Sequence, residues 1–132
     1  MSTTTSTDLE ARAAWSVITE PGDTVAGGFV AAIGHTDALS ALENPVACIT
    51  AIMDAGAASG QEQAAGAVQR WLPRMSAGTI DFALREASRH GIQMLDPAAV
   101  PGIADLGVLA PHLLWVRGDL DAAAGPLSHK IA

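Results

Sequence analysis

The chain of 132 residues contains one cysteine, no tyrosine and half as many basic as acidic side chains. With Cys48 alone, neither a disulfide framework nor a thiolate metal site is expected. Seven Lys and Arg stand against 14 Asp and Glu, a net charge of −7, and such acidity argues against general coating of nucleic acid. Apolar runs fall short of the roughly 20 residues that span a bilayer. The polar N-terminus has no signal-peptide pattern, so the cytoplasm is the expected location.

A hydrophobic content of 49% predicts a folded chain, although many of these residues are alanines that favour helix and bury little area. The length fits one domain, or one domain with a fragment of another. We expect a disordered polar tail over residues 1–7, a helical domain over 8–90 and the opening segment of an α/β domain over 91–132. The fold class is therefore mainly α.

Apolar residues at helical spacing recur through the first 90 positions. They predict helices over 8–19, 24–33, a short stretch from 36, a stretch from 45 to about 55, 61–72 and 79–89. Asp8, Thr36 and Thr79 are the expected N-caps, and Pro73 should kink or end the fifth helix. In the sixth helix the expected inward face consists of Ile80, Ala83, Leu84 and Ala87.

The pattern changes after Gly91. Short apolar runs predict strands at 92–95 and 113–116, with a helical or turn segment near 98–106 between them and a third strand beginning at Lys130. Because helix and strand alternate, we expect the strands to pair in parallel through a crossover.

The run Leu114-Trp-Val-Arg-Gly118, together with the Gly91 strand, resembles the approach to the nucleotide-type domain of DprA, the bacterial DNA-processing family of natural transformation. Residues 11–23 are similar to the first helix and turn of actinobacterial members, and residues 29–39 resemble the helical hairpin that follows. The resemblance implies a SAM-like or helix-hairpin-helix-like bundle followed by the first strands of a truncated Rossmann-like domain. The loop reads Val100-Pro101 where the family usually has an aromatic residue before proline.

What the resemblance implies for function is single-stranded DNA handling and loading of RecA. The family's phosphate-binding turn is not found in this sequence, so its DNA site is expected outside the chain, and the segment itself is expected to be a protein-interaction or scaffold module. The alternative is a free-standing regulator that docks on full-length DprA or another partner by strand addition. A homodimer is a further possible assembly. No catalytic residue, cofactor or metal is predicted, and the chain is not expected to be an enzyme.

Candidate site residues are few. Arg70 and Arg74 flank Trp71, a pattern that fits either a platform for single-stranded nucleic acid or a core tryptophan with exposed neighbours. Residues 33–37 fit either a structural turn or a hairpin that contacts phosphate. Trp115, Arg117 and Gly118 are expected to form a structural motif at the end of a strand. The four histidines are dispersed, which makes a shared metal site improbable, and Cys48 is expected to be a small buried hydrophobe.

Overall fold

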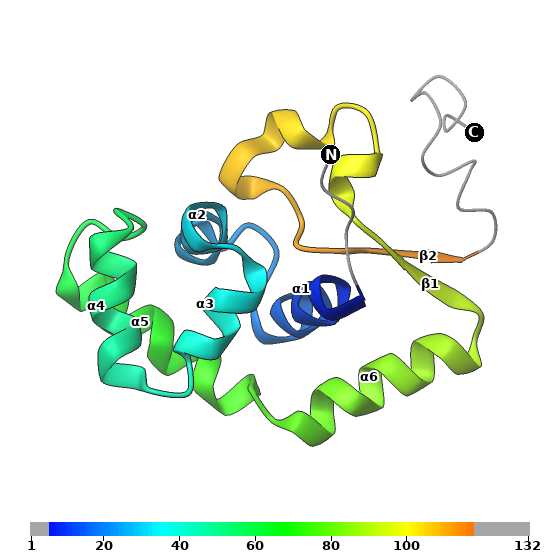
Figure 1. Cartoon of the computed structure of the whole chain (residues 1–132), viewed down its shortest axis with the longest axis horizontal. Helices are drawn as coiled ribbons and strands as arrows, with labels where there is room; N and C mark the ends of the chain where they lie inside the picture. Colours follow the sequence, from blue (N-terminus) through cyan, green and yellow to red (C-terminus); the bar gives the residue numbers. More distant parts are fainter. Residues whose placement is uncertain (1–5, 118–132) are drawn as a thin grey trace.

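The computed structural model describes residues 6–117, which form six α-helices, three short 3-10 segments and two strands (Figure 1). Listed in chain order, the elements are α1 (Ser6–Ile18), α2 (Thr24–Ile33), α3 (His35–Ala41), α4 (Pro45–Asp54), α5 (Gln61–Trp71), η1 (Leu72–Arg74), α6 (Ala77–Arg89), β1 (Ile92–Leu95), η2 (Pro97–Ala99), η3 (Ile103–Leu109) and β2 (Leu114–Arg117). The mainly helical class is confirmed. Gly118, residues 1–5 and the expected strand at Lys130 lie outside the described residues.

Local chemistry explains most helix boundaries. The Asp23 carboxylate accepts a hydrogen bond from the Ala26 amide at 3.1 Å and caps α2. Asn44 caps α4 in the same way, with Pro45 in the first turn. Gly34 has a φ of +90°, a value that favours glycine, and it is the single residue between α2 and α3. The chain therefore turns there without an intervening loop.

Three predicted N-caps are wrong. Asp8 lies in the first turn of α1, which begins at Ser6; its carboxylate accepts a hydrogen bond from Arg12 one turn later. Thr36 lies within α3, because Gly34 already makes the turn. Thr79 lies within α6, because this helix already begins at Ala77, three residues after η1 ends at Arg74. The prediction for Pro73 is confirmed, since α5 ends at Trp71 and gives way to η1.

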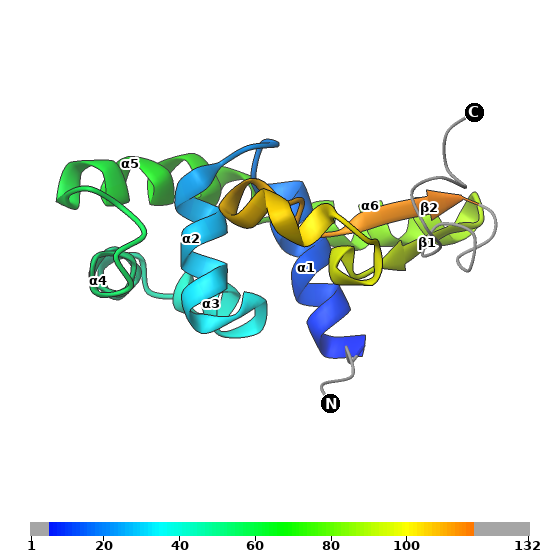
Figure 2. The ribbon, with the colours of Figure 1, turned by 90° about the horizontal axis from the view of Figure 1, so that it is seen from above.

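The core lies among the first five helices. Trp15 and Trp71 meet edge to face, with ring centroids 5.1 Å apart. Around them pack the largest buried apolar side chains, which are Ile18, Phe29, Leu42, Ile52 and Val68. Figures 1 and 2 place α4 and α5 at one end of the molecule and the two strands at the other. No helix within the described residues is long and apolar enough to cross a bilayer.

The strands form an antiparallel ribbon in which Ile92 pairs with Arg117 and Leu95 with Leu114. The predicted parallel pairing is therefore wrong. A parallel pair would need a connection that returns to the start of β1. Here the connection is two short 3-10 segments, and η3 packs on α2 instead of crossing the ribbon. The chain therefore re-enters β2 beside the end of β1.

Gly27 on α2 makes the packing of η3 against α2 possible. A Cβ atom at this position would lie 2.0 Å from the Val108 carbonyl oxygen, so only glycine allows η3 to approach α2 this closely. The close contact holds the segment that leads into β2 over the bundle, and so places the residues of the site described next.

Candidate functional site

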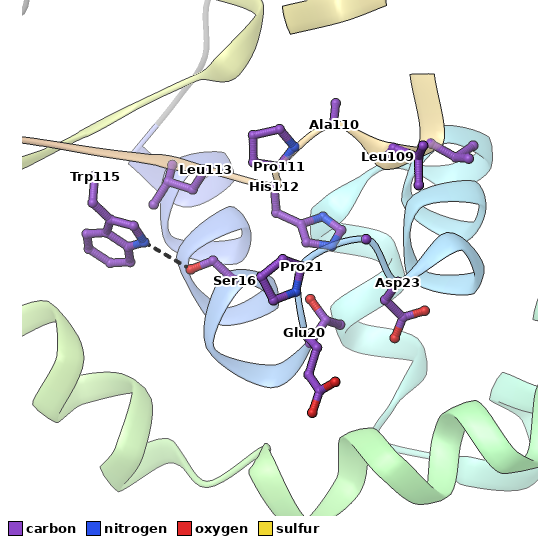
Figure 3. A pocket seen from close by; sticks show the side chains of 13 residues that line it. Ser16, Glu20, Pro21, Asp23, Leu109, Ala110, Pro111, His112, Leu113 and Trp115 are labelled. Atoms are coloured by element: carbon purple, nitrogen blue, oxygen red, sulfur yellow. Dashed lines mark hydrogen bonds between the residues drawn. The ribbon is translucent and has the colours of Figure 1, made fainter. Parts of the chain in front are cut away.

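A groove of about 350 Å³ lies between the α1–α2 turn and the segment that leads into β2 (Figure 3). One wall is the turn itself, Glu20 to Asp23, together with Ser16 of α1 and Thr19, which follows α1. The opposite wall runs from Val108 to Leu113 and ends at Trp115. The groove thus joins two segments almost 90 positions apart in the sequence.

The apolar part of the groove comes from the segment before β2. Val108 and Leu109 are exposed there although they are large and apolar, and Pro111 and Leu113 continue the wall. Trp115 closes the end, 36% exposed, with its indole Nε1 donating to Ser16 Oγ at 3.3 Å (Figure 3). An amphipathic indole at the rim of an apolar groove is typical of protein-contact surfaces.

His112 lies between this groove and a second pocket of about 320 Å³ that its ring also lines. Its Nδ1 is 3.2 Å from Nε2 of His35, at the start of α3. The ring also lies against Trp15, with centroids 6.0 Å apart. The Arg12 guanidinium donates to the His112 carbonyl at 3.2 Å, which ties this segment to α1.

Burial keeps both imidazoles neutral. Desolvation, aided by the nearby Arg12 cation and by His112, lowers the pKa of His35 to about 4. Desolvation also lowers the pKa of His112, while the Asp23 carboxylate acts in the opposite direction. A hydrogen bond between two imidazoles needs an acceptor nitrogen without a proton, so the contact requires at least one neutral ring.

Arg70 and Arg74 lie close to the groove's acidic turn, each near a carboxylate. Arg70 Nη2 is 3.8 Å from Asp23 Oδ2, and Arg74 Nη2 is 3.2 Å from Glu20 Oε1. Both arginines are exposed. The two acids offset the positive potential that a phosphate would meet, and contact of these arginines with nucleic acid stays a prediction.

Trp71 serves the core. Its side chain is 1% exposed, and its Nε1 donates to Asp23 Oδ2 at 2.9 Å. A base cannot stack on a ring that the protein covers on both faces, which removes the tryptophan from the predicted platform.

No known protein family, curated protein or solved structure matches this chain. The resemblance to DprA therefore stays a hypothesis that rests on the residues quoted above. Trp115 and Arg117 lie in β2 and both are exposed; Gly118 falls outside the described part of the chain, so the structural motif stays a prediction.

The remaining candidates fall on structural positions. The turn at residues 33–37 is followed by Ala38, which is fully buried. Within the turn, the His35 carbonyl accepts a hydrogen bond from Trp15 Nε1 at 3.0 Å. Cys48 is buried, and burial raises the pKa of its thiol. Within residues 6–117 no three His, Cys, Asp or Glu side chains gather as a metal site would need.

Sequence reasoning missed the groove and the His35–His112 pair. The two histidines are 77 positions apart, and no local sequence pattern predicts the hydrogen bond between them. Nothing in the sequence indicated that the acids of the turn at residues 20–23 would face arginines from α5 and η1.

Proposed function

We propose that this chain is the N-terminal part of a DprA-like DNA-processing protein and serves there as a protein-contact module. In this proposal the whole protein handles single-stranded DNA and loads RecA during natural transformation and recombination in the cytoplasm. The described part would have no catalytic role. Support comes from the order of its elements, a helical bundle followed by strands at the residues that carry the resemblance.

The observation that carries the contact role is the groove of Figure 3. It offers exposed Val108, Leu109 and Trp115 to a partner. The neighbouring arginines are matched by Glu20 and Asp23. An apolar and aromatic surface beside paired charges is better suited to bind a protein than the phosphate backbone of a nucleic acid.

Two binding measurements test the proposal with the purified 132-residue chain. Fluorescence anisotropy with labelled 20-nucleotide oligo(dT) at 150 mM salt should give no saturable binding at micromolar protein. Calorimetry with the RecA of the same organism should give a complex that Leu109→Ser weakens about tenfold. The matched control is Val46→Ser, because Val46 is an equally apolar residue, 77% exposed, on α4. Tight binding of oligo(dT), or equal effects of the two substitutions, would contradict the proposal.

A second candidate is the free-standing regulator that binds full-length DprA by strand addition. The observation in its favour is the two-stranded ribbon, in which each described strand pairs with one neighbour only. A stoichiometric complex with full-length DprA, seen by size exclusion with light scattering, would favour this candidate. A proline at Val116, which removes a backbone donor from β2, should then weaken that complex.

A further inference from the structure

The chain between η3 and β2 is a linking segment of four residues, Ala110 to Leu113, and His112 ties it to the bundle. The imidazole Nδ1 of His112 is 3.2 Å from His35 Nε2, and its carbonyl accepts a hydrogen bond from Arg12. Leu113 beside it is buried, but none of the four residues belongs to the core cluster of the first five helices. The linking segment can therefore move without opening that core.

The contact between the two imidazoles depends on how many protons they carry. In the neutral pair one ring donates an N–H and the other accepts it. A first added proton leaves one neutral ring, which can still accept the hydrogen bond. A second proton leaves no acceptor, and two cationic N–H groups then face each other where the nitrogens are now 3.2 Å apart. The contact therefore tolerates one added proton and fails with two.

The groups around the pair give a doubly charged state little compensation. Burial is the main cause of the lowered pKa of both rings, and the Arg12 cation on α1 adds to it. Three acids act in the opposite direction: Asp8 of α1 and Asp96 before η2 on one ring, and Asp23 before α2 on the other. Asp8 and Asp96 already lie 2.8 and 3.4 Å from Arg12, and Asp23 already caps α2. All three acids thus have other contacts to satisfy.

We infer that the contact between His35 and His112 is a pH-sensitive switch: when both rings are protonated, the linking segment leaves the bundle while the core of the first five helices stays folded. Release lets water solvate both charged rings and exposes Leu113. Because His112 and Leu113 line the groove of Figure 3, the groove loses part of that wall in the released state. The switch does not depend on the proposed function, since it rests on the contacts of the two histidines alone.

Two protons taken up on release make the switch steep in pH. The logarithm of the equilibrium constant for release should rise by about 1.5 to 2 for each pH unit between pH 6 and pH 5. His35→Gln leaves one titrating ring in the pair, so the slope should fall to about 1 or less. His90→Gln, which changes an exposed histidine at the end of α6, is the matched control and should keep the slope of the parent chain.

Thiol accessibility measures the release. Leu113→Cys places a thiol in the linking segment, and Cys48, fully buried in the core, reports on unfolding of the core in the same chain. Rates of reaction with 4,4′-dithiodipyridine are divided by those of the urea-unfolded chain at each pH. The introduced thiol should become reactive as the pH falls below 6, with the slope given above, while Cys48 stays at least about a hundredfold better protected at pH 5.

A pH-independent rate at the introduced thiol, a slope that His35→Gln leaves unchanged, or equal protection of the two thiols overturns the switch. Because Leu113→Cys removes buried apolar volume and so weakens the segment itself, NMR of the parent chain gives a second measurement. The side-chain nitrogens of His35 and His112 should titrate together with shifts of the Leu113 amide, while the Trp71 indole keeps its folded position. Titration of both rings without a change at the Leu113 amide overturns the switch as well.

Discussion

A chain of polar contacts runs through the apolar part of the bundle. Trp15 Nε1 donates to the His35 carbonyl, His35 bonds to His112, and the Arg12 guanidinium reaches the His112 carbonyl. Arg12 also lies 2.8 Å from Asp8 and 3.4 Å from Asp96. The contacts of His35 and Arg12 with His112 join the bundle to the segment before β2, so these residues help to fix the shape of the groove.

The neutral histidines make stability depend on pH. In the unfolded chain His35 titrates near 6.5, whereas in the folded chain its pKa is about 4. Between these two pKa values the unfolded state binds more protons than the folded state. The contribution of the neutral His35 to the free energy of unfolding is therefore full above about pH 6.5 and is lost as the pH falls toward 4. The lowered pKa of His112 acts in the same direction. Asp8, Asp96 and Asp23 favour the charged rings and limit the loss.

Urea unfolding followed by tryptophan fluorescence should therefore give a free energy of unfolding about 1–2 kcal/mol lower at pH 5 than at pH 7, after allowance for the solvent-facing part of the rings. His35→Gln should reduce this pH dependence to the part that His112 contributes. His90→Gln, which changes an exposed histidine at the end of α6, should leave it as it was. A pH dependence that His35→Gln leaves undiminished would show that other groups cause it.

Among the elements, the contact between α2 and η3 decides where the segment before β2 lies. Gly27→Ala would place a methyl group where the Val108 carbonyl now stands. We expect a loss of about 1–3 kcal/mol in the free energy of unfolding, because backbone has to move. Thermal unfolding measures this loss. Because Trp115 follows the segment that would move, the degree to which a soluble quencher reduces its fluorescence should change as well.

Gly66→Ala is the matched control for that substitution. Gly66 also lies inside a helix, α5, but its added Cβ would meet only the end of the Arg70 side chain, at 3.9 Å. Alanine there should raise stability by about 0.5–1 kcal/mol, because it has the better helix propensity. If both glycines respond alike, the approach of η3 to α2 is not as tight as described.

The helices and strands could be located from the sequence, because their signals are local. Pro73 marks one helix end, and α2 and β1 occupy the residues predicted for them, whereas the observed caps Asp23 and Asn44 are not the predicted ones. The direction of β2 could not be predicted, since it depends on how η3 packs on α2, a contact between distant segments. The predicted inward face of α6 does turn toward the bundle, since Ala87 is buried and Ile80 packs against the core. That Ala83 and Leu84 are only half-buried could not be predicted, because amphipathic spacing shows which face is apolar but not how fully it is covered.

For the whole molecule, the uneven distribution of buried side chains predicts uneven stability. Every fully packed member of the core cluster lies between Ala14 and Trp71. By contrast, Ala87 is the one buried residue among those of α6 whose burial is described, and the ribbon is two strands of four residues each. Two-stranded sheets have little stability of their own in water, so α6 and the ribbon depend on the bundle more than the bundle depends on them.

Hydrogen exchange followed by mass spectrometry should resolve this difference. Amides of α6 and β1 should exchange through a partial opening of lower free energy than that of α1, α2 and α5. Gly27→Ala should speed exchange in η3 and β2 and leave α4 unchanged, because η3 packs on α2 and α4 packs on α5. Uniform protection across residues 6–117 would mean that the ribbon and the bundle unfold together, and that the contacts of Arg12, His35 and His112 join the two parts more strongly than their burial indicates.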